Sequence, residues 1–261
     1  MRVVIVGEGK SGTTALMRSV ADSLDSPVEL FEPRSITPDD IAPESLVIKK
    51  LLMNWQRSET ELLPNFDKRL LITRDPRDRL ISHMLYDAYN RAPMMSERRR
   101  RRWLRTLKRK VEHPRKVPMA ELIHVWWRVS KADLLSTHVR VLDRGVAFHN
   151  HRAITSFHVV KYEDYVVGNF DALNDYLGFT IEPGVVKDSE QRVSRTKSSG
   201  AWRHWFTPSD VKLFRPMTHR WLKETGGDSK DWKLAKNPTI DPATSIDYVS
   251  SFFDQVSAKD S

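Results

Sequence analysis

The sequence predicts an α/β fold in which a central parallel sheet of about five strands is flanked by helices. Short apolar runs rich in β-branched residues, which are typical of buried strands, alternate with segments whose apolar residues recur at helical spacing. This alternation is characteristic of parallel sheets with crossover helices. The 261 residues are enough to bury one core of this kind, so we expect a single domain over residues 1–261.

The elements are expected in the following order. The strands are Val3–Val6, Val28–Pro33, Leu46–Lys49, Leu70–Thr73 and Phe157–Tyr162, and the first two helices contain Leu16–Leu24 and Leu80–Ala88. A basic helical insertion at about 90–135 contains helices 97–112 and 119–135, and Trp126 and Trp127 of the second helix should face inward. Further helices are expected at Phe170–Leu177, Thr207–Gly226 and about 246–257, whereas 140–155 is left unassigned. Thr207, Pro208 and Asp210 carry the signature of a helix start.

The composition narrows the classes of function. The chain has no cysteine, which excludes disulfides and thiolate metal sites. No apolar run approaches the length of a membrane span, and Met1 leads almost directly into the first strand, so we expect a cytoplasmic protein without membrane contact. The net charge of +9 resides in residues 97–116, which hold eleven Lys and Arg against two Glu. The rest is balanced, so no nucleic-acid partner is expected.

A glycine-rich loop follows the first strand, and its residues are Gly9, Lys10, Ser11, Gly12, Thr13 and Thr14. A strand, a turn and a helix start direct backbone N–H groups and the helix dipole to one point, where Lys10 adds a positive charge, so we expect an anion there. The P-loop of nucleotide triphosphatases has a glycine five positions before its Gly-Lys pair, but Val4 occupies that position within the strand. The loop is therefore P-loop-like but too short to enclose β- and γ-phosphates.

Lys10-Ser11-Gly12-Thr13-Thr14 resembles the loop with which sulfotransferases hold the 5′-phosphosulfate of 3′-phosphoadenosine 5′-phosphosulfate (PAPS). Arg74-Asp75-Pro76-Arg77-Asp78, with Ser82 on the next helix, resembles the 3′-phosphate site of that family. A dianionic phosphate is well matched by a guanidinium fork and a hydroxyl donor near a helix N-terminus. The alternative is an exposed Arg74–Asp75 ion pair and a surface serine.

Two later segments add to this resemblance. The segment from Arg195 to Thr207 is similar to the family's loop over the 3′-phosphate, which implies that Arg195 binds that phosphate. The family's lysine falls on Thr196 here, so we assign the second cation to Lys197. Tyr162-Glu163-Asp164 resembles the segment in which the family's tyrosine approaches the adenine. Alternatively, the segment from Arg195 to Thr207 is an ordinary loop that leads into a helix, and Tyr162 is a tyrosine packed at a strand end.

The resemblance also implies catalytic roles. Lys10 would neutralise the bridging oxygen as the 5′-phosphate leaves, and Lys49 would steady the oxygens of the moving sulfuryl group. The histidine of the cytosolic enzymes falls on Leu51, whereas Phe31-Glu32-Pro33 resembles a segment of carbohydrate sulfotransferases, so Glu32 is the candidate base and His83 a lesser one. Alternatively, Glu32 only pairs with Arg34 or Lys49.

The sequence as a whole therefore predicts a sulfotransferase that moves a sulfuryl group from PAPS to a hydroxyl, or less readily an amine, and releases 3′-phosphoadenosine 5′-phosphate (PAP). The acceptor would be a small molecule or a carbohydrate, no metal is required, and a homodimer is left open. Acceptor choice is expected in residues 52–66 and 86–120. Two alternatives remain: a P-loop nucleotide kinase, and a non-enzymatic module that binds polyanions through residues 97–116.

Overall fold

The computed structural model of the chain describes residues 1–151, 156–184 and 198–257. It confirms the α/β class, with a five-stranded, all-parallel sheet flanked by helices. The internal contacts divide the chain into two compact units. We call Met1–Asp75 with Asp143–Ser199 the sheet unit, and Pro76–Leu142 with Gly200–Ser261 the helical unit. The expected single domain over 1–261 stays a prediction.

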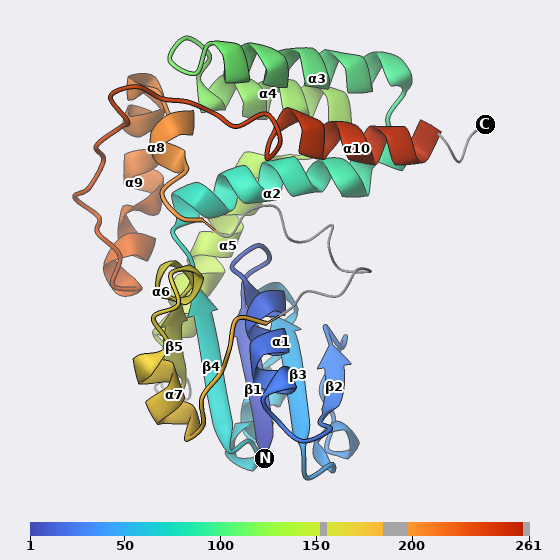
Figure 1. The fold of residues 1–261 in the computed structure, drawn as a ribbon, viewed down its shortest axis with the longest axis vertical. Coiled ribbons are helices and arrows are strands. Elements are labelled where there is room, and N and C mark those ends of the chain that lie inside the picture. Colours follow the sequence, from blue (N-terminus) through green and yellow to red (C-terminus); the bar gives the residue numbers. More distant parts are fainter. Residues whose placement is uncertain (152–155, 185–197, 258–261) are drawn as a thin grey trace. The chain divides into compact units, whose positions relative to one another are not determined.

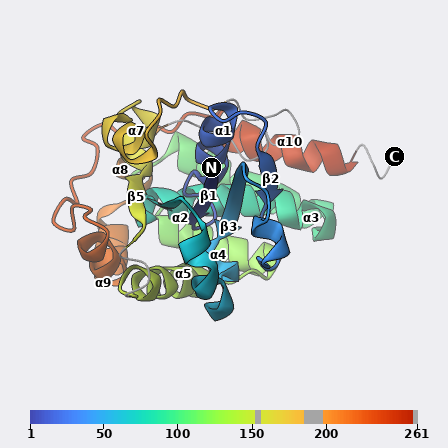
Figure 2. The ribbon, with the colours of Figure 1, turned by 90° about the horizontal axis from the view of Figure 1, so that it is seen from below.

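The five strands lie in the order β2-β3-β1-β4-β5, as Figures 1 and 2 show. Their bounds are β1 (Arg2–Gly7), β2 (Val28–Phe31), β3 (Leu46–Leu51), β4 (Lys68–Thr73) and β5 (His158–Lys161). Central strands of a parallel sheet are covered on both faces, which explains why Val3–Val6 and Leu46–Ile48 are continuous apolar runs without exposed surface. All five predicted strands are present, but β2 ends at Phe31 before Glu32 and Pro33, and β5 leaves out Phe157 and Tyr162, of which Tyr162 already belongs to the next helix.

Apolar clusters cover both faces of the sheet. Helices α1 (Thr13–Asp22) and α7 (Asp171–Leu177) cover one face, and Figure 2 shows them on the same side. The short helix α6 (Tyr162–Val166) adds Tyr162 and Tyr165 to that cluster. The other face is covered by the 3₁₀ helices η1 (Asp39–Ile41), η2 (Leu52–Asn54) and η3 (Arg57–Asn65), together with Phe148 and Phe157. Phe148 belongs to α5 (Leu134–His149), which runs from one unit into the other.

The helical unit has its own apolar core. Its other helices are α2 (Pro76–Arg91), η4 (Ala92–Met94), α3 (Glu97–Glu112), α4 (Met119–Ser130), α8 (Trp202–Trp205), α9 (Pro208–Glu224) and α10 (Ile246–Ser257). The rings of Trp103 and Trp126 lie 4.9 Å apart between α3 and α4, and both side chains are fully buried. Phe252 and Phe253 of α10 join the same core. The apolar residues of α3 and α10 therefore form the buried faces of these helices.

One predicted helix has the wrong end and the wrong inner face. The helix expected over 119–135 ends at Ser130, because Lys131 takes the left-handed conformation with φ 63°. Leu134 then starts α5, which covers 140–149 of the segment left unassigned. Trp126 is buried and its Nε1–H donates to Asp87, but Trp127 is 49 % exposed because the next helical position turns to the border of the apolar face.

The predicted helix start at Thr207 is confirmed, and its acid has a second role. The Thr207 hydroxyl and the Asp210 carboxylate form a reciprocal capping box at the start of α9. The same carboxylate accepts the backbone N–H groups of Met119 (2.8 Å) and Ala120 (3.0 Å), which open α4. Asp210 therefore caps two helices.

Nowhere in the part of the chain that the structure describes does a helix combine the length and apolar character needed to cross a membrane.

Candidate functional site

The loop between β1 and α1 lies at the point where the chain order of the sheet reverses. From the central strand β1, the neighbouring strands are β3 on one side and β4 on the other. In Figure 1 the arrowheads of these strands lie at the same edge of the sheet. Such a switch point is where open α/β sheets bind their ligands. The loop spans only residues 8–12, since β1 ends at Gly7 and α1 begins at Thr13.

Local hydrogen bonds and a close packing contact shape this loop. The Ser11 backbone N–H and hydroxyl both donate to the Glu8 carbonyl, at 3.1 and 2.7 Å. Gly12 precedes α1 with φ 94°, and a Cβ there would lie 2.5 Å from the Tyr162 ring. Only glycine tolerates both the left-handed backbone and this approach. Tyr162, predicted at the nucleotide site, is therefore packed directly on the loop.

Lys49 at the end of β3 joins two other predicted residues. Its ammonium donates to the Thr14 hydroxyl at 2.8 Å and to the Glu32 carboxylate at 2.5 Å. It also lies 3.9 Å above the centre of the Phe31 ring, and its side chain is buried. Glu32 keeps about a third of its side chain exposed. The pairing of Glu32 with Lys49 that the sequence left open is formed, and proton transfer by Glu32 stays a prediction.

Arg74 at the end of β4 lies against the other side of the loop. Its guanidinium donates to the Lys10 carbonyl at 2.9 Å and lies 4.1 Å above the centre of the Tyr162 ring. The side chain is 7 % exposed, so the alternative of an exposed ion pair with Asp75 does not describe it. Arg74 therefore places a cation beside the glycine-rich loop.

A buried acid links the Tyr162 segment to the Arg74 segment. The Asp75 backbone N–H donates to the Glu163 carboxylate at 2.9 Å. Burial raises the pKa of Glu163 above its ordinary value, and the hydrogen bond from Asp75 opposes this shift. Two segments that were predicted independently are therefore joined where β4 and β5 end.

Two residues of the site have unusual backbone angles. Lys10 has φ 71° and Glu32 has φ 52°, although neither is a glycine. A non-glycine residue in this region costs free energy and persists only where its surroundings hold it, often at functional sites. At Glu32 the surroundings include its backbone N–H, which donates to the Lys49 carbonyl at 2.9 Å.

A buried ion pair that was not predicted from the sequence holds the residues directly after Glu32. The Lys50 ammonium donates to the Glu59 carboxylate at 2.7 Å and to the carbonyls of Pro33 and Arg34, each at 2.9 Å. Glu59 also accepts the backbone N–H groups of Ile36 (2.9 Å) and Gln56 (2.8 Å). This pair thus holds the turn after Glu32. A second lysine directly after Lys49 in a buried strand was a signal that an acid partner must exist.

The other predicted residues lie elsewhere. Ser82 is buried on α2 in the helical unit, and His83 follows it there, so a shared phosphate site of Ser82 with Arg74 stays a prediction. Arg195 and Lys197 lie outside the described residues. Close to them, the backbone N–H groups of Gly200 (2.5 Å) and Trp202 (2.8 Å) donate to Asp78. Asp78 therefore joins the second and third predicted motifs within the helical unit.

The search for known relatives adds no family to this picture. Neither a protein-family model nor a curated protein matches the sequence. Among the residues that the structure describes, no group of three or more His, Asp or Glu side chains could hold a metal ion. The site is thus defined by its own geometry: a short glycine-rich loop flanked by Lys49 with Glu32 on one side and by Arg74 with Tyr162 on the other.

Proposed function

We propose that this chain is a sulfotransferase that uses PAPS as donor and a hydroxyl of a small molecule or carbohydrate as acceptor. The observation that carries the proposal is that, at the switch point of the sheet, Arg74 contacts the Lys10 carbonyl and Lys49 contacts Thr14 in the first turn of the helix that follows the loop. These residues come from three separate segments that resemble one family in the same chain order. An unrelated glycine-rich turn would not require them to meet.

The residues around the loop suit the parts of such a donor. The five-residue loop and the start of α1 match the size of one phosphate, to which Lys10 would add a positive charge, whereas a triphosphate needs a longer loop. Arg74 supplies a second cation, and Tyr162 supplies an aromatic ring beside it. When bound, PAPS would supply an activated sulfuryl group whose transfer releases PAP.

The chain's own groups would act by position and charge. Lys10 and Lys49 stabilise negative charge that grows on the oxygens around the transferred group, as cations do in phosphoryl transfer. Thr14 and Glu32 hold the Lys49 ammonium in place through their hydrogen bonds. The exposed part of Glu32 faces solvent, where it can accept the proton of the acceptor hydroxyl.

The test is calorimetric titration with PAP, which requires no knowledge of the acceptor. We expect micromolar binding to the wild type and at least about tenfold weaker binding to Arg74→Ala, because a charge-assisted hydrogen-bond donor is lost. Arg57→Ala is the matched control, since Arg57 is an exposed arginine of the same unit. ATP binding without PAP binding would refute the proposal in favour of a nucleotide kinase.

A further inference from the structure

The exposed face of α3 carries only charged residues. They are Glu97, Arg98, Arg99, Arg101, Arg102, Arg105, Lys108, Arg109 and Glu112. Arg98, Arg102, Arg105 and Arg109 follow one another at steps of four, three and four residues, which places them in one line along the helix. We call these four residues the arginine stripe. It is roughly 16 Å long at the rise of an α-helix.

Most of the stripe has no acidic partner. Arg109 pairs with Glu121 at 3.1 Å, and the two acids of α3 pair beside the stripe, Glu97 with Arg101 and Glu112 with Lys108. In the described part of the chain, the guanidinium groups of the other three stripe residues make no hydrogen bond or ion pair. These three are Arg98, Arg102 and Arg105. Three of the four positive charges of the stripe are therefore uncompensated.

Folding does not favour this arrangement. Like charges three or four residues apart repel one another on a helix, and Arg98 lies in the first turn, where the helix dipole disfavours cations. The helix is held instead by its opposite face, where Trp103 and Leu107 are fully buried. The charges of the stripe are thus placed against the local preferences of the helix, which is common where a surface serves binding.

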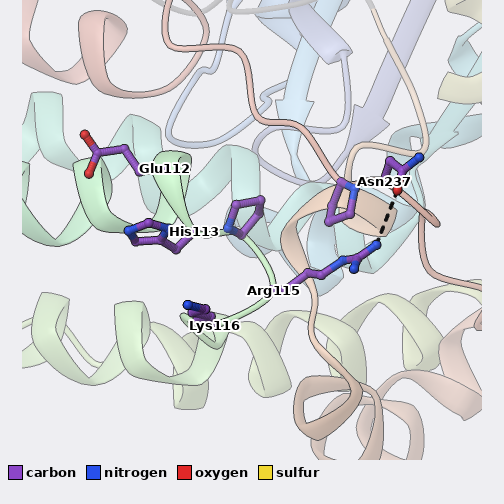
Figure 3. A pocket seen from close by; sticks show the side chains of 7 residues that line it. Glu112, His113, Arg115, Lys116 and Asn237 are labelled. Atoms are coloured by element: carbon purple, nitrogen blue, oxygen red, sulfur yellow. Dashed lines mark hydrogen bonds between the residues drawn. The ribbon is translucent and has the colours of Figure 1, made fainter.

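A polar pocket continues the stripe at the carboxyl end of α3. It has a volume of about 320 Å³ and is lined by Glu112, His113, Pro114, Arg115, Lys116, Asn237 and Pro238. Figure 3 shows Arg115 reaching toward Asn237, with a hydrogen bond of 3.5 Å, while Glu112 lies toward the opposite end. Arg115 also donates to the Lys236 carbonyl. Among the described residues, the Lys116 ammonium has no hydrogen-bond partner, so it is available to an anion.

We propose that the arginine stripe and this pocket together form a binding surface for an acidic polysaccharide. The stripe binds successive sulfate or carboxylate groups, and the pocket binds one such group through Lys116 and Arg115. This inference goes beyond the proposed function and does not depend on it, because the polysaccharide is bound whether or not it is the acceptor.

The chemistry of the surface favours this partner over other polyanions. Neither the stripe nor the pocket contains Phe, Tyr or Trp, on which single-stranded nucleic acids stack their bases. Guanidinium groups, which make up the whole stripe, form paired hydrogen bonds with carboxylate and sulfate-like oxygens. Membrane insertion is disfavoured because the apolar face of α3 is buried. The surface therefore offers guanidinium and ammonium groups to sulfate and carboxylate oxygens and lacks the Phe, Tyr or Trp rings that stack on bases.

The experiment measures binding of a fluorescent heparin octasaccharide by anisotropy, without nucleotide. The test variant is Arg98→Gln/Arg102→Gln/Arg105→Gln. The matched control is Lys212→Gln/Arg215→Gln/Arg220→Gln, which removes the same charge from exposed positions of α9 in the same unit. We expect at least about tenfold weaker binding and a shallower salt dependence in the test variant, and binding within about twofold of wild type in the control. Lys116→Gln should also weaken binding.

Three outcomes would overturn the proposal. One is equal weakening by the test and control variants, since binding would then follow net charge. Another is no heparin binding by the wild type at about 0.1 M salt, at which exposed charges still interact over roughly 10 Å. The third is tighter binding of a single- or double-stranded oligonucleotide than of heparin, which would assign the surface to nucleic acid. Circular dichroism of each variant verifies that it is folded.

Discussion

The buried Lys50–Glu59 pair allows a quantitative test of how the turn after Glu32 is held. Lys50 is fully buried and Glu59 is 1 % exposed. In the variant Lys50→Met, Glu59 keeps its hydrogen bonds from Ile36 and Gln56 but loses the Lys50 ammonium. Removal of one partner of a buried ion pair costs about 3–5 kcal/mol, because an uncompensated charge remains. The hydrogen bonds of Lys50 to the carbonyls of Pro33 and Arg34 are only partly buried, so water can replace the lysine there.

Amide hydrogen exchange is the suitable assay because it follows the sheet unit directly, whereas tryptophan fluorescence does not. Trp55 is the single tryptophan of the sheet unit, so fluorescence mainly follows the helical unit. A loss of 3–5 kcal/mol should speed the slowest amides of β1 and β3 by about 100-fold to several thousand-fold. Lys50→Met/Glu59→Gln should recover part of this loss, since no charge is left behind. If the amides of β1 and β3 exchange at the same rate in Lys50→Met as in the exposed control Arg57→Met, the ion pair does not hold this turn.

Three further predictions concern the candidate base Glu32, the loop residue Gly12 and the buried Lys110. Glu32→Gln should lower sulfuryl transfer by about 10²- to 10⁴-fold with unchanged PAP affinity, as loss of a general base does, and near-normal turnover would exclude Glu32 as the base. Gly12→Ala should destabilise the sheet unit by about 1–3 kcal/mol more than Gly168→Ala, and amide hydrogen exchange measures the difference. Both glycines have a positive φ, but only at Gly12 would an added Cβ meet the Tyr162 ring. Burial lowers the pKa of Lys110 to about 8 from its ordinary 10.5. At a pH between these two values, the Lys110 side chain is therefore protonated in the unfolded chain and neutral in the folded chain. The contribution of Lys110 to the free energy of unfolding therefore rises with pH. Between about pH 7.5 and pH 10.5, the free energy of unfolding of the wild type should rise by up to about 3 kcal/mol relative to that of Lys110→Met, as measured by urea unfolding followed by fluorescence. A difference that does not change with pH would contradict this.

Several features could be read from local patterns. Buried strands of a parallel sheet are continuous apolar runs, so Val3–Val6 and Leu46–Ile48 were evident without a structure. The cap at Thr207 depends on residues three positions apart, which a sequence contains directly. The helix end at Lys131 was missed, because a left-handed lysine carries no glycine signal.

By itself the sequence determined the α/β class, the order of the strands along the chain and the types of residue available to an anion site, because these depend on neighbours within a few residues. Only the tertiary structure decided which of those residues meet. Lys49 with Thr14 and Glu32, and Arg74 with the Lys10 carbonyl, are pairs from separate segments, brought together by the sheet order β2-β3-β1-β4-β5. Such contacts arise from packing and burial of charge between distant segments, and neither is encoded in local spacing.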